Sequence, residues 1–155
     1  MRLYISRHAQ AVSKDEHPDR PLSDVGRDQA ERVSAFAKAA GMEIENAFHS
    51  GKARARQTAE IYAKTLGGDI EVQAIDGLSP EDDPAGLDNF LDDLTAPALL
   101  AGHLPHLEGF IHHLTTGAAD AGFLKLSPAA LVCLDREPGR RRWRLAWYVE
   151  PSLLP

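Results

Sequence analysis

The sequence predicts a three-layer α/β/α fold whose central sheet is mainly parallel with an antiparallel edge. Short apolar runs alternate along the chain with longer stretches whose apolar residues recur at helical spacing. Strands interleaved with helices in this way are typical of α/β domains with a parallel sheet. The last run, residues 143–149, follows a Pro138-Gly139 turn and alternates in hydropathy. That pattern predicts a hairpin at the sheet edge.

Each element has its own local signal. Ser23 can cap the first helix, in which Val33, Phe36, Ala37 and Ala40 follow the i, i+3, i+4, i+7 rule, and Gly41 can end it. We expect a loop of about 15 residues before Ser23, longer than packing requires. Strands are expected near residues 3–6, 44–49, 70–75, 98–101, 130–134 and 143–149, and the later helices near residues 52–66, 87–94 and 107–114.

Composition narrows the class of protein. The 155 residues, 43% of them hydrophobic, suit one domain spanning 1–155 that buries a core without staples. The net charge of -6 argues against binding to nucleic acid or to an anionic membrane. A single cysteine, Cys133, excludes a disulfide framework and a CxxC zinc site. With no long apolar run and no secretory signal, we expect a cytoplasmic monomer.

Three strand ends carry arginine or histidine. Arg7-His8 follows the first strand, Arg54 lies in the first turn of the helix after the second, and Gly102-His103 follows the 98–101 strand. In open α/β sheets, ligands bind beyond the carboxyl ends of the strands. Guanidinium forks suit phosphate oxygens, and a helix N-terminus adds N–H donors. Alone, Arg7-His8 and Arg54 are more often surface groups, and His103 could cap or hydrogen-bond a buried loop. Together they predict a phosphoryl pocket with histidine inside it.

The segments around these residues resemble the histidine phosphatase superfamily, also called the phosphoglycerate mutase-like family. Residues 7–11, Arg-His-Ala-Gln-Ala, are similar to its Arg-His-Gly signature, residues 50–59 to its second arginine motif, and residues 101–106 to its second histidine motif. Residues 19–26 and 78–80 resemble the short branch typified by the SixA protein-histidine phosphatases. The resemblance covers the chain to about residue 135 and implies the phosphoglycerate mutase-like fold.

Two positions depart from the family pattern. The family glycine after the nucleophile is Ala9 here, so this turn must avoid positive φ. The proline usual after Ser50 is Gly51, and we expect it to loosen that turn. Neither change removes a reacting group.

The resemblance implies that His8 is the nucleophile and is transiently phosphorylated. An imidazole is substantially neutral near pH 7, and the cations Arg7 and Arg54 disfavour a further positive charge on it. They also neutralise the phosphoryl oxygens, so no metal and no other cofactor is expected. By the same resemblance His103 also contacts these oxygens, and we expect it to be protonated when it lies beside an anion.

The leaving group points to the substrate class. An alcohol leaves poorly unless an acid protonates it, and many larger relatives place a glutamate for this task after the third strand. Here that segment holds Glu81, Asp82 and Asp83, but it resembles the SixA type, which lacks a dedicated acid. We expect these carboxylates to form a solvated turn that caps the helix near Gly86. An imidazole can depart neutral, which favours phosphohistidine as substrate.

Further residues receive secondary roles. We expect Arg20 and His106 to contact substrate, and Lys14, Arg20 and Lys125 to line its entrance. The run of arginines at 140–142 and 144 predicts a solvated hairpin face, with a docking surface for an acidic phosphoprotein as the alternative.

The remaining histidines suggest little chemistry. His112 and His113 are adjacent on the fourth helix and are expected at the surface. A zinc site built from His103, His106 and His112 lacks a supporting cysteine or HExxH pattern, so no metal ligand is predicted.

Three functions remain open. The leading hypothesis is a phosphatase that works through a phosphohistidine intermediate and acts on a phosphohistidine protein, such as a phosphotransfer domain or phosphocarrier. The alternatives are a phosphatase of small phosphorylated metabolites and, in another class, a non-catalytic domain that binds a phosphorylated ligand. Mutase activity is disfavoured because little chain remains to enclose a sugar phosphate.

Overall fold

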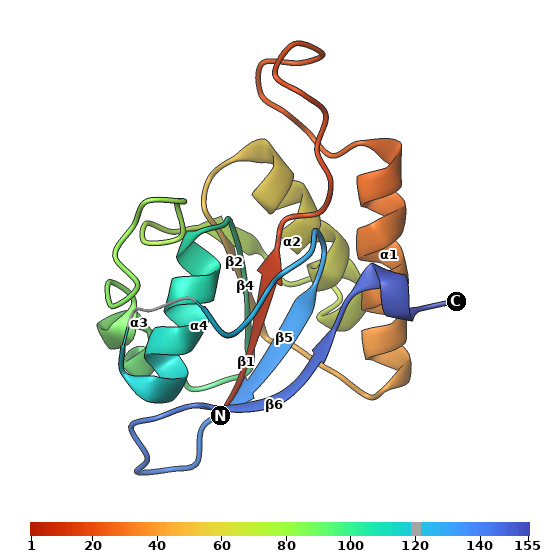
Figure 1. The fold of residues 1–155 in the computed structure, drawn as a ribbon. Helices are drawn as coiled ribbons and strands as arrows, with labels where there is room; N and C mark the ends of the chain where they lie inside the picture. Colours follow the sequence, from red (N-terminus) through yellow and green to blue (C-terminus); the bar gives the residue numbers. More distant parts are fainter. Residues whose placement is uncertain (119–121) are drawn as a thin grey trace.

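The computed structural model describes residues 1–118 and 122–155 and gives one central sheet flanked by helices (Figure 1). In chain order the elements are β1 Arg2–Arg7, α1 Asp24–Ala39, β2 Asn46–His49, α2 Ala53–Leu66, β3 Val72–Ala74, α3 Asp88–Asp93, β4 Ala98–Gly102, α4 His106–Thr116, β5 Leu131–Asp135, β6 Arg144–Val149 and a 3-10 turn at Pro151–Leu153.

Within these residues the sheet has six strands in the order β3-β2-β4-β1-β5-β6. The pairs β3-β2, β2-β4 and β4-β1 are parallel, whereas β5 runs antiparallel to both β1 and β6. The prediction of a mainly parallel sheet with an antiparallel hairpin at one edge is therefore confirmed.

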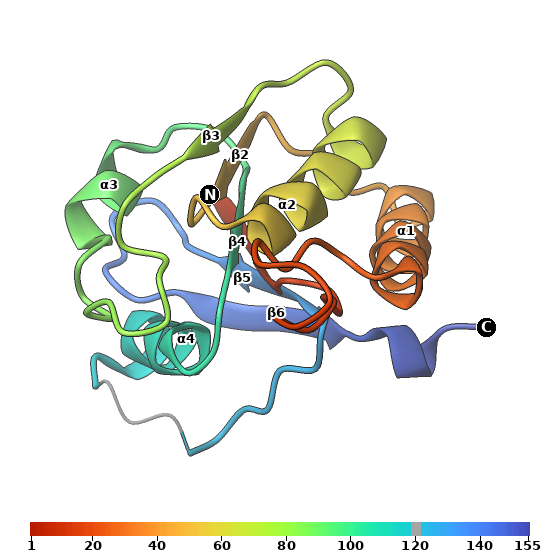
Figure 2. The same ribbon diagram turned by 90° about the horizontal axis from the view of Figure 1, so that it is seen from above.

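Helices cover both faces of the sheet, as the view along its layers shows (Figure 2). On one face Leu91 of α3 and Phe110 of α4 belong to one buried apolar cluster, and on the other Val33 of α1 and Tyr62 of α2 belong to a second. Successive residues of a strand point to opposite faces, so β1 contributes side chains to both clusters. The three-layer arrangement matches the prediction.

Two strands are shorter than the sequence predicts. The second begins at Asn46 and not at Ile44, because the Ile44 N–H points to the Leu66 carbonyl at the end of α2 and so does not join the ladder. The third covers only Val72–Ala74, and it pairs on one side only, with β2, at the edge of the sheet. Neither change moves a strand end that carries a predicted site residue.

The loop between β1 and α1 projects beyond the carboxyl ends of the parallel strands (Figure 1). Its base is closed by the main chain, with a bridge between Ala11 and Leu22. Ser23 caps α1, as predicted, by accepting a hydrogen bond from the Gly26 N–H, and its own N–H and hydroxyl both donate to the Gln10 carbonyl oxygen. The start of α1 therefore holds the residues that directly follow β1.

Gly26 allows α1 to approach the loop this closely. A Cβ at position 26 would lie 1.9 Å from the Gln10 carbonyl oxygen, so Gly26→Ala must displace the loop or the helix. We expect the variant to lose roughly 1–3 kcal/mol of unfolding free energy in urea denaturation. Its exposed neighbour offers the control, since Arg27→Ala should leave stability nearly unchanged. Equal stability of the two variants would contradict this packing.

Candidate active site

The carboxyl ends of β1 and β4 bring the two predicted histidine motifs together. Arg7 pairs in register with Gly102, and the His8 N–H donates to the Gly102 carbonyl over 3.0 Å. The rings of His8 and His103 lie 5.0 Å apart, centroid to centroid, at 52°. The charges of Arg54 and Arg7 both lower the pKa of His8, so both guanidinium groups lie near its ring. Arg7, His8, Arg54 and His103 thus form one cluster, the four pocket residues.

A backbone carbonyl fixes the state of the His8 ring. Nδ1 lies 2.7 Å from the Ala9 carbonyl oxygen. Because a carbonyl only accepts hydrogen bonds, Nδ1 must carry the proton, and the lone pair of the neutral ring is then on Nε2. Burial lowers the pKa of His8 to about 4; the bond to Ala9 opposes this, and the charges of Arg54 and Arg7 add to it. At neutral pH the ring is therefore uncharged, with its lone pair on one defined nitrogen.

His103 is also held by a neighbour. Its side chain is buried, and its Nε2 lies 2.6 Å from the hydroxyl of Ser50, the residue that follows β2. Burial lowers the pKa of His103 to about 3, helped by the charges of His8 and Arg54. The ring is therefore neutral at pH 7, and the protonated form expected beside an anion needs that anion's charge to stabilise it.

The two arginines offer guanidinium N–H groups to the pocket. Arg7 donates one, from Nη1, to the Leu126 carbonyl over 2.9 Å. The Nε atoms of Arg7 and Arg54 are buried and have no hydrogen-bond partner among the described residues. Burial lowers the pKa of both side chains, yet an arginine stays charged at any physiological pH. Two partly buried cations, each with a buried N–H that lacks a partner among the described residues, make a site for an anion with several oxygens, such as a phosphoryl group.

The second arginine motif supports the segment that follows β1 through contacts from α2. Thr58 lies one turn after Arg54; its hydroxyl accepts a hydrogen bond from the Ala9 N–H over 3.0 Å and donates to the Arg54 carbonyl over 2.8 Å. Gln57 accepts from the Leu22 N–H over 2.8 Å. Sequence reasoning quoted both residues within the motif but gave them no role. Their spacing of three and four from Arg54 was the available signal, since it places all three on one helix face.

A second supporting segment escaped sequence reasoning altogether. Residues 124–130 precede β5, and the Ala129 N–H points at the carbonyls of Arg7 and His8. Ala129 has a φ of +60°, and its own carbonyl accepts from the buried Tyr62 hydroxyl over 2.8 Å. Nothing in the local sequence marks this contact, because the partners lie more than 60 residues apart along the chain.

Arg20 and His106 lie close to the pocket in different settings. Arg20 donates to the Val12 carbonyl within the projecting loop, and its charge lowers the pKa of His8. His106 is only 3% exposed, its ring stacks on Phe110, and neither ring nitrogen has a partner among the described residues. Burial lowers its pKa, so it lies as a neutral ring beside His103. Contact of either residue with substrate stays a prediction.

The acidic segment after β3 folds on itself. Asp82 accepts a hydrogen bond from the Ser79 N–H over 2.8 Å, and Asp83 accepts from the Ala85 N–H over 2.9 Å. The following helix, α3, begins at Asp88 and has no side-chain cap. The prediction that these carboxylates cap the helix is wrong, because they satisfy N–H groups of their own loop first. Glu81 is exposed, as a solvated turn requires.

The arginine-rich hairpin lies at the other end of the sheet. Asp135 pairs in register with Arg2 at the start of β1, whereas His8 follows its end, and Figure 1 shows the hairpin loop and the projecting loop on opposite sides. Arg140 and Arg144 are exposed and form ion pairs with Glu137, in agreement with a solvated face. Docking of substrate there would not bring a phosphoryl group to His8.

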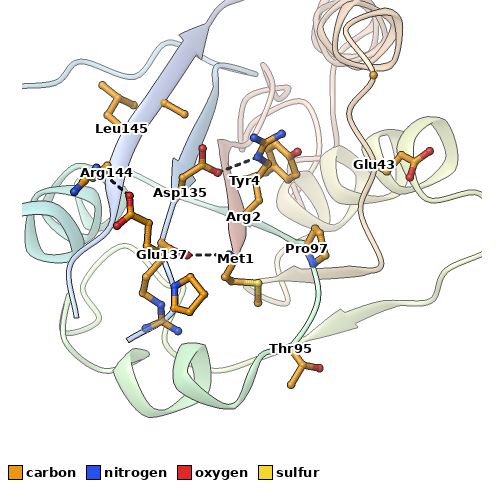
Figure 3. Close-up of a pocket in the computed structure, with 14 residues that line it drawn as sticks. Met1, Arg2, Tyr4, Glu43, Thr95, Pro97, Asp135, Glu137, Arg144 and Leu145 are labelled. Atoms are coloured by element: carbon orange, nitrogen blue, oxygen red, sulfur yellow. Dashed lines mark hydrogen bonds and ion pairs between the residues drawn. The ribbon is translucent and has the colours of Figure 1, made fainter. Parts of the chain in front are cut away.

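An open groove of about 910 Å³ lies at this same end. Its arginines have acidic partners, with Arg2 paired to Asp135, Arg144 to Glu137 (Figure 3) and Arg136 to Asp92. It therefore lacks the free donors that distinguish the four pocket residues.

The other predicted positions have simple environments. The prediction that His112 and His113 are surface groups is wrong: His113 is half-buried with its Nε2 2.9 Å from an Asp88 oxygen, and His112 packs on Phe123. Across residues 1–118 and 122–155, no group of three or more histidine, cysteine or acidic side chains is arranged to hold a metal ion. Lys14 and Lys125 are exposed.

None of the described helices combines the length and apolarity that a membrane span requires.

Comparisons with known proteins agree with this geometry. The family model of the histidine phosphatase superfamily (branch 1) matches residues 3–79. An uncharacterized protein of Picosynechococcus sp. is 30% identical over 141 residues, which cover 86% of this chain and 84% of that protein.

Solved structures share the whole fold. The protein histidine phosphatase SixA, solved with tungstate, superposes with a TM-score of 0.87 at 23% identity over 99% of both chains. A phosphoserine phosphatase of Entamoeba histolytica gives a TM-score of 0.69 at 15% identity over 97% of this chain and 98% of that one. The fold is thus phosphoglycerate mutase-like, and the chain belongs to the histidine phosphatase superfamily.

Proposed function

We propose that the protein is a phosphatase that removes the phosphoryl group from phosphohistidine on another protein, through a phosphohistidine intermediate on His8. The observation that carries this proposal is the neutral His8 ring, held with its Nε2 lone pair free beside Arg7 and Arg54. A non-catalytic binding domain would need the two cations but not a nucleophile in one fixed tautomer. This observation therefore favours catalysis over binding alone.

The proposed reaction has two displacements at phosphorus. In the first, the Nε2 lone pair of His8 forms a bond to phosphorus while the bond to the leaving imidazole nitrogen breaks. The leaving ring keeps that electron pair and, since its other nitrogen has taken a proton from solvent, departs as a neutral imidazole. In the second, water attacks phosphorus, the bond to Nε2 breaks, and the protons of water remain on phosphate and solvent. Through both steps the proton of His8 stays on Nδ1, which donates it in a hydrogen bond to the Ala9 carbonyl oxygen.

The arginines supply the electrostatic part of the proposed mechanism. Phosphoryl transfer depends mostly on positioning and on stabilising charge at the equatorial oxygens. Arg7 and Arg54 have buried N–H donors for those oxygens, and His103 becomes a further cationic donor when a phosphoryl group raises its pKa. On this proposal the reaction proceeds without a metal ion.

The choice of phosphohistidine rests on the leaving group. The carboxylates of Asp82 and Asp83 already accept hydrogen bonds from their own loop, and Glu81 is exposed, so none is positioned as a buried acid. An imidazole leaves without such an acid, whereas an alkoxide does not. SixA, which has the same fold, is described as a protein histidine phosphatase, while another protein of this fold is a phosphoserine phosphatase. A phosphatase of small metabolites is accordingly the alternative.

A substrate panel tests the proposed function. We expect turnover in the order phosphohistidine peptide, then p-nitrophenyl phosphate, then alkyl phosphate esters, because the leaving groups need proton donation in the reverse order. Activity should survive EDTA and disappear in His8→Ala. Replacement of the acidic trio, by Glu81→Gln, Asp82→Asn and Asp83→Asn together, should barely change turnover of phosphohistidine.

The opposite pattern would move the function to the alternative. If the parent protein prefers alkyl esters and the triple variant loses that preference, one of the carboxylates acts as a general acid. Retained turnover in His8→Ala would remove His8 from the reaction.

Arg54 should be essential to the phosphate pocket. Removing a preorganised cationic donor costs on the order of 100–1000-fold in rate, and we expect this loss of kcat/KM in Arg54→Ala. Arg54→Lys should recover only part of it, since a point charge cannot form the guanidinium fork. Arg56→Ala is the control, because Arg56 is about half exposed and pairs with Glu60 at the surface. An Arg54→Ala enzyme within a few-fold of the parent would contradict the pocket.

The protonation of His8 can be measured directly. Because burial and the two arginines lower its pKa to about 4, its ring should titrate near pH 4 in NMR and not near the ordinary 6.5. The nucleophile then stays unprotonated down to about pH 4, so loss of kcat/KM through His8 starts only there. In Arg54→Ala the same titration should move upward. A parent ring that titrates near 6.5 would refute the neutral nucleophile.

A further inference from the structure

The turn that joins β2 to α2 departs from the expected sequence in a way that the structure explains. Gly51 has a φ of +87°, a conformation that proline cannot adopt. It also has an N–H that a proline would lack. This N–H lets the turn gain a hydrogen bond that proline would not allow, and the expectation of a loosened turn depends on whether an acceptor lies within reach.

The side chain of His49 supplies that acceptor. His49 ends β2, where it pairs with Ala101 and Ala74 in the two neighbouring strands, and it is only 5% exposed. Its Nδ1 lies 2.9 Å from the Gly51 nitrogen, which donates. Asparagine and aspartate often bond the backbone two residues on in the same way, and here a histidine closes the turn.

This contact also fixes the ring of His49. Since Gly51 N–H is the donor, Nδ1 is unprotonated and the ring's proton is on Nε2. Burial lowers the pKa of His49. Two charged side chains face it from α2: Arg56 lowers that pKa further, and Glu60 raises it. The acceptor is thus present at neutral pH.

The turn places the hydroxyl that contacts His103. Ser50 lies between His49, anchored in the sheet, and Gly51, anchored by the imidazole, so both of its flanking peptides are fixed. Its hydroxyl reaches His103 Nε2 at 2.6 Å. Lys52 then occupies the N-cap position of α2 without a side-chain capping bond, and Arg54 follows in the first turn.

We propose that His49 is a positioning residue, whose imidazole holds the Gly51 turn and thereby directs the Ser50 hydroxyl onto His103. The proposal rests on the proposed phosphatase function for its effect on rate, but not for its effect on phosphate binding. It assigns a role to a buried histidine that touches no substrate. The departure from proline at position 51 is then compensated by the residue two positions earlier.

Two substitutions at position 49 distinguish the role of the hydrogen-bond acceptor from that of the side-chain volume. His49→Asn keeps an acceptor that can close the same turn, and its kcat/KM should stay within a few-fold of the parent. His49→Leu keeps an apolar side chain but frees the Gly51 N–H. Because small displacements in a phosphoryl-transfer site are costly, we expect kcat/KM to fall by roughly 10–100-fold. His112→Leu, a partly buried histidine elsewhere, is the matched control and should be neutral.

Coupling to Ser50 distinguishes positioning from general destabilisation. In a Ser50→Ala background, His49→Leu should cost almost nothing more, whereas a merely structural effect would add in full. Inorganic phosphate should bind more weakly to His49→Leu than to His49→Asn, whatever the physiological substrate. Additive losses, or equal losses in the Asn and Leu variants, would overturn the proposal.

A measurement on the parent protein tests the proposal even if the His49 variants do not fold. Nitrogen NMR should report an unprotonated Nδ1 in His49 with coupling to Gly51 across the hydrogen bond. A protonated Nδ1 would refute the proposal without any substitution. If the parent hydrolyses no phosphate substrate, the proposed function fails, but the phosphate-binding and NMR results still decide the role of His49. The His49 proposal and the proposed function can therefore fail independently.

Discussion

The hydrogen bond from His8 Nδ1 to the Ala9 carbonyl is the interaction on which the site depends. It selects one tautomer of a neutral ring, with the lone pair on Nε2, in a site where the charges of Arg54 and Arg7 act on that ring. The bond forms only if the main chain at Ala9 is held in place, and three separate elements do this. Thr58 of α2 accepts the Ala9 N–H, the start of α1 holds the Gln10 carbonyl, and Ala129 bonds the carbonyl of His8.

The same arrangement makes the pocket costly to fold. Two partly buried arginines lie beside the partly buried His8 and the buried His103, and among the described residues Glu108 is the acid whose charge raises the pKa of Arg7. The pKa values of His8 and His103, about 4 and 3, lie below the ordinary 6.5. Between those values the unfolded chain binds more protons than the folded one, so stability falls as pH drops below 6.5. Under the proposed function, a phosphoryl group would bring the negative charge that this pocket lacks, and phosphate binding should therefore raise the stability of the fold.

Much of this could be predicted from the sequence, for identifiable reasons. The strand ends that hold Arg7, Arg54 and His103 follow from hydropathy patterns and from one topological rule about parallel sheets. Contacts between distant segments left no local signal: the Tyr62 hydroxyl on Ala129 and the Ser50 hydroxyl on His103 join residues 67 and 53 positions apart. The acidic turn was assigned to helix capping because sequence cannot show which N–H groups its carboxylates reach first. His49 was read only as part of a strand, since its contact depends on the backbone angle of Gly51.

The position of the phosphoryl bond on the enzyme tests the central claim most directly. The protein is mixed with a phosphohistidine peptide, quenched in base, and analysed by phosphorus NMR or by mass spectrometry of its peptides. If the hydrogen bond to the Ala9 carbonyl keeps the proton on Nδ1 throughout, the phosphoryl group must be on Nε2 of His8. A phosphoryl group on Nδ1, or on another residue, would show that this hydrogen bond does not set the nucleophile and would contradict the account.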